Sequence, residues 1–153
     1  MSQRHDCIFC RIAKKGVPAH VIWEDEKHVA FLSIFPNTEG FSVVITKDHY
    51  PSYLFDLPDE VVRDLVLAAK KVGKLLDERF DDVGRTGMMF EGFGVDHIHA
   101  KLFPMHGTKS SEWTKRKSSV DKYFEQYEGY ISSHDHARAD DETLERLATR
   151  IKG

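Results

Sequence analysis

The segment from His97 to Lys101 alternates nitrogen-bearing side chains with small apolar ones. In a β-strand successive side chains point to opposite faces, so His97, His99 and Lys101 are predicted to line one surface. Two imidazoles and an ammonium on one patch suit the negative charge that develops on a phosphate during displacement. The same spacing is also typical of a half-buried strand whose polar face holds histidines, so spacing alone leaves both interpretations open.

The sequence holds two cysteines, Cys7 and Cys10, in a Cys-x-x-Cys arrangement. The polar start lacks the apolar segment of a secretory signal, and no apolar run reaches the roughly 18 to 20 residues that span a bilayer. We therefore expect a cytoplasmic protein that does not act at a membrane. In a reducing compartment this cysteine spacing favours metal binding or redox chemistry over a structural disulfide.

Length and composition indicate one folded domain. The chain has 153 residues, of which 41% are hydrophobic, and this is enough for a core. The formal net charge is -3, so general attraction to a nucleic acid backbone is not implied.

The elements that must position these groups follow from local patterns. Residues 7–15 have apolar side chains at helical spacing and stop at Gly16, which predicts a short helix. Residues 21–24, 29–34 and 41–46 are predicted to be strands of an antiparallel meander. A long helix is expected to begin beside Pro58 and to end near Phe80, because apolar residues recur every three or four positions between them.

Two further strands are predicted at residues 84–91 and 95–103, joined by a tight turn at 92–94, with the histidine segment on the second strand. Residues 141–152 carry acids early and basic residues late, as expected of a terminal helix. The chain beyond residue 107 is too short to carry its own core, so we expect it to pack on the preceding domain.

The run His97-Ile98-His99-Ala100-Lys101-Leu102-Phe103-Pro104 resembles the signature of the histidine-triad (HIT) superfamily, His-φ-His-φ-His-φ-φ, in which φ is apolar. The similarity covers about residues 7–107 and follows the Hint-like branch. It includes the stretch Cys7-Ile8-Phe9-Cys10-Arg11-Ile12, followed in order by residues 16–19, 21–25, 30–36 and 44–49.

This resemblance implies an α+β HIT fold, in which an antiparallel β-meander sheet carries one long helix and a short N-terminal helix. It also implies a homodimer, since the sheets of two protomers join in that family. The HIT domain would occupy residues 1–107, and residues 108–153 would form a C-terminal extension packed on it.

The chemistry that the resemblance implies is nucleotidyl transfer. His99 would attack an α-phosphorus, release a leaving group and form a nucleotidyl-histidine that water hydrolyses. A neutral imidazole is a competent nucleophile near pH 7. Lys101 would be its electrostatic partner, and His97 would orient it or bind zinc. The expected substrates are dinucleoside polyphosphates or nucleoside phosphoramidates.

Three positions depart from the family pattern. Lys101 replaces the third histidine; it can supply charge but cannot exchange its proton near neutrality unless its environment shifts it. The loop from Phe90 to Gly94 is short and lacks Asn, Gln and Ser, so backbone N–H groups such as that of Gly94 would meet the phosphate. Ser33 stands where the family has an acid on the ribose hydroxyls.

The resemblance also implies two sets of binding residues. The nucleoside pocket would be formed by Ile8, Phe9, Ile12, Phe31 and Ile34, together with Ser33 and Gly94. A structural zinc ion would be bound by Cys7, Cys10, His49 and His97, a combination of two thiolates and two imidazoles that suits tetrahedral zinc.

Two other functions remain open at this stage. One is a zinc-stabilised nucleotide-binding or protein-interaction module with little catalytic activity, which the departures at Lys101, Ser33 and the short loop favour. The other is a Cys-x-x-Cys oxidoreductase, but the predicted strand order does not suggest the parallel βαβ setting that such enzymes use.

Overall fold

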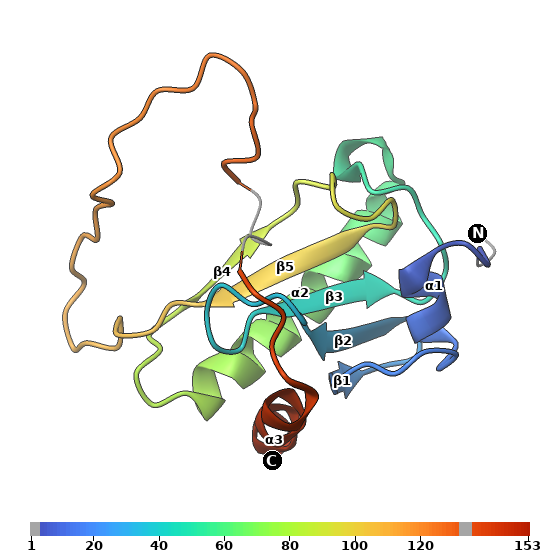
Figure 1. The fold of residues 1–153 in the computed structure, drawn as a ribbon, viewed down its shortest axis with the longest axis horizontal. Helices are drawn as coiled ribbons and strands as arrows, with labels where there is room; N and C mark the ends of the chain where they lie inside the picture. Colours follow the sequence, from blue (N-terminus) through green and yellow to red (C-terminus); the bar gives the residue numbers. More distant parts are fainter. Residues whose placement is uncertain (1–3, 132–135) are drawn as a thin grey trace.

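The computed structural model describes residues 4–131 and 136–153. Its largest feature is a five-stranded antiparallel sheet with the strand order β1-β2-β3-β5-β4 (Figure 1). The helices and strands are α1 (Ile8–Ala13), β1 (Val21–Glu24), β2 (His28–Leu32), β3 (Ser42–Thr46), the 3-10 turn η1 (Leu54–Asp56), α2 (Asp59–Arg79), β4 (Thr86–Met89), β5 (His99–Pro104) and α3 (Asp141–Lys152). The α+β prediction is confirmed.

The predicted meander is confirmed for the first three strands, which pair in chain order. The last two strands do not continue that order. β5 pairs with β3, opposing His99 to Ile45 and Lys101 to Val43, and β4 lies outside β5 as an edge strand. The strand that carries the histidine segment is therefore internal, with a partner on each side.

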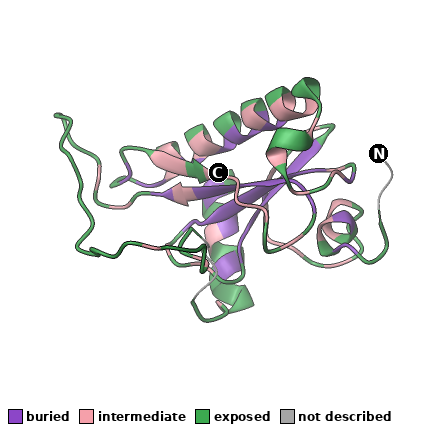
Figure 2. Cartoon of the chain, turned by 90° about the horizontal axis from the view of Figure 1, so that it is seen from above, coloured by how far each residue is buried: buried purple, intermediate pink, exposed green. Residues whose placement is uncertain are grey.

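The long helix α2 begins and ends where its sequence signals predict. Pro58 precedes it, the acids Asp59 and Glu60 occupy its first turn, and Arg79 lies in its last turn. Figure 2 shows buried residues along the sheet and on the side of α2 that is turned toward it. Those helix residues are Leu65, Ala68, Ala69, Val72 and Leu76, and they pack against the sheet in the main core.

The terminal helix α3 is also confirmed, and it packs on the sheet domain. The side chain of Asp140 caps its N-terminus by accepting a hydrogen bond from the backbone N–H of Thr143, at 2.9 Å. Leu144 and Ile151 are buried in the main core, which also contains Ile22 of β1. Burial of this helix face anchors the C-terminal residues to the sheet.

The last two predicted strands are longer than the observed ones: of residues 84–91, only Thr86–Met89 form β4. Residues 95–98 belong to a loop, and β5 begins only at His99. The predicted tight turn at 92–94 is likewise absent, because Ile98 donates its backbone N–H to the carbonyl of Tyr50 and Ser52 donates its hydroxyl to the carbonyl of Gly92. The loop is therefore held by the segment after β3 and does not pair with β4.

Residues 105–131, the part of the tail described before α3, hold neither helix nor strand and form a long, mostly exposed excursion from the sheet (Figure 1). It returns to the body where Tyr127 stacks on Phe93, with 5.5 Å between ring centroids. Within the described residues no helix is both long and apolar enough to cross a membrane.

Candidate active site and metal centre

His99 lies at the start of β5 and is 4% exposed. Its Nδ1 atom is 2.6 Å from the carbonyl oxygen of His97. A carbonyl oxygen can only accept, so Nδ1 carries the proton and, in a neutral ring, Nε2 carries the lone pair. The backbone of the preceding loop thus fixes the tautomer that a nucleophilic imidazole requires.

The side chain of Phe9 packs beside His99 and against a second aromatic ring, that of Phe31. The ring of Phe9, from α1, lies 5.1 Å from the His99 ring and 5.5 Å from the ring of Phe31, from β2. Ile12 packs in the same apolar cluster as Phe31. The structure therefore brings three of the predicted nucleoside-pocket residues together on the sheet face opposite α2, with His99 beside them.

The other predicted nucleoside-pocket residues differ from one another in their exposure to solvent. Ser33 is buried, and its hydroxyl accepts the backbone N–H of Phe35 at 3.1 Å. Ile8 and Ile34 are exposed by 41% and 37%. Gly94 is an exposed member of the loop before β5.

Lys101 is buried and forms an ion pair with Glu91, whose side chain is buried as well. The other carboxylate oxygen of Glu91 accepts the backbone N–H of Phe93 at 3.0 Å. Burial opposes ionisation of this carboxyl, but the hydrogen bonds from Lys101 and Phe93 outweigh it and hold the pKa of Glu91 below its usual range.

Sequence reasoning missed Glu91. Its signal was indirect: Lys101 stands between the apolar residues Ala100 and Leu102 in a predicted strand, and an ammonium buried there needs a counter-charge. Glu91 is the acid in the loop that precedes the strand.

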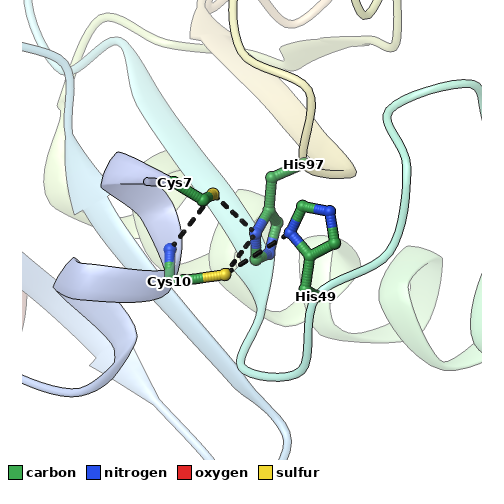
Figure 3. A group of neighbouring side chains, drawn as sticks. All are labelled: Cys7, Cys10, His49 and His97. Atoms are coloured by element: carbon green, nitrogen blue, oxygen red, sulfur yellow. Dashed lines mark hydrogen bonds between the residues drawn. The ribbon is translucent and has the colours of Figure 1, made fainter. Parts of the chain in front are cut away.

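The four predicted metal ligands come together. One nitrogen or sulfur atom from each of Cys7, Cys10, His49 and His97 lies within 4.8 Å of every other, and all four residues are buried (Figure 3). The Nδ1 atom of His97 lies 3.4 Å from Sγ of Cys7, and the Nδ1 atom of His49 lies 3.4 Å from Sγ of Cys10. Helix α1 and its N-cap residue Cys7 thus supply two sulfur atoms that face imidazoles from two loops.

The second ring nitrogen of His97 forms a hydrogen bond that keeps Nδ1 turned toward the cysteines. Its Nε2 lies 2.7 Å from the carbonyl oxygen of Thr46, so Nε2 donates and Nδ1 keeps its lone pair for the cluster. Burial lowers the pKa of His97 to about 4 and raises the pKa of the Cys10 thiol. Four buried, convergent donors of this kind can hold a metal ion.

Comparisons with known proteins agree with this architecture. The family model described as HIT domain matches residues 14–108. The adenosine 5'-monophosphoramidase of Saccharomyces cerevisiae is 33% identical over 119 residues, which cover 76% of this chain and 75% of the yeast protein. Its counterpart of the same name in Schizosaccharomyces pombe is 34% identical over 99 residues, covering 64% of this chain and 73% of that protein.

Solved structures share the fold. A HIT-like protein of Bartonella henselae superposes with a TM-score of 0.69 at 19% identity, covering 99% of this chain and 98% of the other. A zinc-bound histidine triad family protein of Mycobacterium smegmatis gives 0.68 at 22% identity, covering 96% and 91%. With the match of the family model over most of the sheet and the confirmed fold, the chain belongs to the HIT domain family.

Proposed function

We propose that this chain is a nucleotide hydrolase or transferase that attacks an α-phosphorus through His99. The observation that carries the proposal is the hydrogen bond from Nδ1 of His99 to the carbonyl of His97, because it leaves the Nε2 lone pair as the nucleophile. In the first step an N–P bond forms at Nε2 and the bond from phosphorus to the leaving group breaks. In the second step water attacks phosphorus, the N–P bond breaks and a nucleoside monophosphate is released.

The base and ribose would lie against the apolar cluster next to His99. Phe9 and Phe31 would stack on or flank the base, and Ile8, Ile12 and Ile34 would complete the pocket. Ser33 would offer its hydroxyl to the ribose, and the backbone N–H of Gly94 would meet a phosphate oxygen. Lys101 would stabilise the charge that grows on the phosphoryl oxygens, since a buried charge is poorly screened.

Zinc is the metal that the cluster suits, because two thiolates and two imidazoles in a closed, buried set match its structural sites. Bound zinc would supply structural cross-linking of α1 to the loop after β3 and to the loop before β5. Cys7, Cys10, His49 and His97 would hold it, and the carbonyl of Thr46 would orient the ring of His97. Its thiolate ligands favour a reducing compartment, which keeps the cytoplasm as the proposed location.

The substrates we expect are nucleoside phosphoramidates or dinucleoside polyphosphates. Two fungal relatives bear the name adenosine 5'-monophosphoramidase, and this supports the first class. The acting unit would be a homodimer of HIT domains at residues 1–107, with residues 108–153 as an extension on each.

The test detects the proposed nucleotidyl-histidine intermediate. Protein is mixed briefly with adenosine 5'-phosphoramidate or diadenosine polyphosphate and denatured in base, in which a phosphorus–nitrogen bond to histidine survives. Intact mass spectrometry should show one added nucleoside monophosphate, and His99→Ala should lose both the adduct and about 99.9% or more of the turnover, a loss expected of an essential nucleophile. Turnover by His99→Ala at the wild-type rate would overturn the proposal.

A second candidate is a nucleotide-binding module with little turnover. The enclosure of Lys101 by Glu91 favours it, because a paired ammonium in a closed environment has less charge to offer a phosphate. Nucleotide binding in equilibrium dialysis without adduct or product would select this candidate.

A further inference from the structure

The ion pair between Lys101 and Glu91 is enclosed by the protein. Their side chains are 1% and 2% exposed, whereas the other lysine-to-carboxylate pairs among the described residues are substantially more exposed. Lys101 follows His99 by two residues on β5, so both side chains lie on the sheet face opposite α2. Glu91 reaches this face from the loop that follows Met89, the residue opposite Lys101 in β4.

The carboxylate of Glu91 is itself held in place. Besides its bond to Lys101, it accepts the backbone N–H of Phe93 at 3.0 Å. The adjacent Gly92 has a φ of 76°, and its carbonyl accepts the hydroxyl of Ser52 at 2.8 Å. A Cβ at this glycine would lie 2.9 Å from the Ser52 carbonyl oxygen, so this position of the loop requires glycine. The carboxylate of Glu91 therefore belongs to a loop that these contacts hold in place.

A buried ammonium is stable only when a counter-charge and hydrogen bonds replace its water. Without Glu91, the ammonium of Lys101 would be buried with no counter-charge, and its side chain is expected to withdraw from the sheet face. Glu91 thus holds the charge of Lys101 in place beside the nucleophile. An imidazole, which is stable in its neutral form, would not need such a partner.

We propose that Glu91 is the positioning residue for Lys101, so that the two residues together, and not the lysine alone, take the place of the third histidine. This inference rests on the proposed function of His99. Both oxygens of Glu91 are occupied by Lys101 and the loop, so Glu91 acts on the reaction through Lys101. The pair carries no net charge, and its positive end supplies the field at the phosphoryl group.

A double-mutant cycle on turnover of adenosine 5'-phosphoramidate tests this coupling. Glu91→Gln should lower kcat at least tenfold while KM changes less than threefold, because the substrate-binding residues remain. In the Lys101→His background, whose own kcat should stay within tenfold of wild type, adding Glu91→Gln should cost less than threefold. Glu91→Asp keeps the charge and should recover part of the lost kcat.

Two controls separate positioning from folding. Glu24→Gln breaks the ion pair with Lys47, which spans 2.6 Å and is partly exposed, and it should leave kcat unchanged. The double variant Glu91→Gln with Lys101→Met removes both charges, and it should regain thermal stability relative to Glu91→Gln without regaining kcat. The rate is expressed per folded molecule, and near-ultraviolet circular dichroism measures the folded fraction of each variant.

Several results would overturn the inference. Wild-type or raised kcat in Glu91→Gln would show that the carboxylate has no positioning role or blocks the site. Equal losses on adding Glu91→Gln to the wild type and to the Lys101→His variant would assign Glu91 a structural role only. If Lys101→His is itself inactive, the cycle is replaced by Glu91→Asp: its failure to recover kcat would likewise assign Glu91 a structural role only. Activity retained in His99→Ala would instead overturn the proposed function, so the two failures are distinguishable.

Discussion

The carbonyl oxygen of His97 lies 2.6 Å from Nδ1 of His99, while the imidazole of His97 lies among the sulfur atoms of Cys7 and Cys10. One residue therefore serves two sites: its backbone orients the proposed nucleophile, and its side chain belongs to the metal cluster. The two sites are coupled through backbone position. A change in the metal cluster should displace His99 slightly. It should also destabilise the fold, because a cross-link is lost.

The first prediction concerns metal removal. Chelation of zinc-loaded protein should lower the melting temperature by about 10 °C, since a few kcal/mol of lost stability shifts the midpoint by roughly 2 to 4 °C per kcal/mol in a chain of this size. Turnover per folded molecule, measured below the new midpoint, should fall less than threefold. Cys10→Ser should reproduce both effects, and added zinc should restore only the chelated wild type. An unchanged melting temperature after verified metal loss would contradict a structural metal.

The second prediction concerns the enclosed ion pair. Lys101→Met leaves a carboxylate buried without its partner, so the free energy of unfolding should fall by about 3 to 5 kcal/mol. Adding Glu91→Gln should restore most of that loss. Lys47→Met, which opens a partly exposed pair, is the matched control and should cost less than about 1 kcal/mol. Urea unfolding of the four proteins measures this, and equal losses for Lys101→Met and Lys47→Met would show that enclosure has no energetic effect.

The sequence predicts most of the fold because its signals are local. Helix α2 and helix α3 carry proline or aspartate at the start, acids in the first turn and one apolar face, and both form as expected. The loop before β5 does not follow its pattern. The prediction extended the strand back to residue 95, but β4 ends at Met89, and Ile98 donates its backbone N–H to the carbonyl of Tyr50, beyond the end of β3.

The two sites differ in how far sequence could reach them. The metal ligands were placed by family resemblance, because His49 and His97 lie 39 and 87 residues beyond Cys10 and spacing alone does not join them. The partner of Lys101 was not predicted. Glu91 meets the lysine only once β5 pairs with β4 and the loop folds back toward Ser52, so this contact depends on tertiary structure.

The third prediction concerns pH and uses a pair outside the candidate site. His106 donates toward the Asp82 carboxylate at 3.1 Å and the Glu39 carbonyl at 2.7 Å. Partial burial favours the neutral ring, but these two acceptors outweigh it and raise the pKa of His106 above its usual value. A raised folded-state pKa means that the stabilisation is complete below the unfolded pKa, about 6.5, and is lost as pH rises through the folded value.

Zinc-loaded wild type should therefore lose stability relative to His106→Gln as the pH rises above about 6.5, whereas the unfolding free energy of the variant should vary less with pH. Asp82→Asn removes the charged acceptor and should also flatten the profile. Urea unfolding at each pH measures the slopes. A variant slope as steep as that of wild type would assign the dependence to another group.

The last prediction concerns the proposed homodimer. β4 is an edge strand, and Met88 on it is 48% exposed. Beside it lies a hollow of about 370 Å³ between β4 and α2, lined in part by Val66, Ala69 and Gly73. An unpaired edge next to an apolar hollow favours pairing with a second copy, because both the backbone groups and the apolar surface gain partners.

Met88→Lys should raise the dimer dissociation constant at least tenfold, since the change places a charge in the joined face. Val120→Lys, at a position 72% exposed on the tail, should leave the constant unchanged. Sedimentation velocity over a concentration series measures both. If both variants dissociate equally, the β4 edge is not the interface. If wild type sediments as a monomer throughout, the candidate site must be complete within one chain.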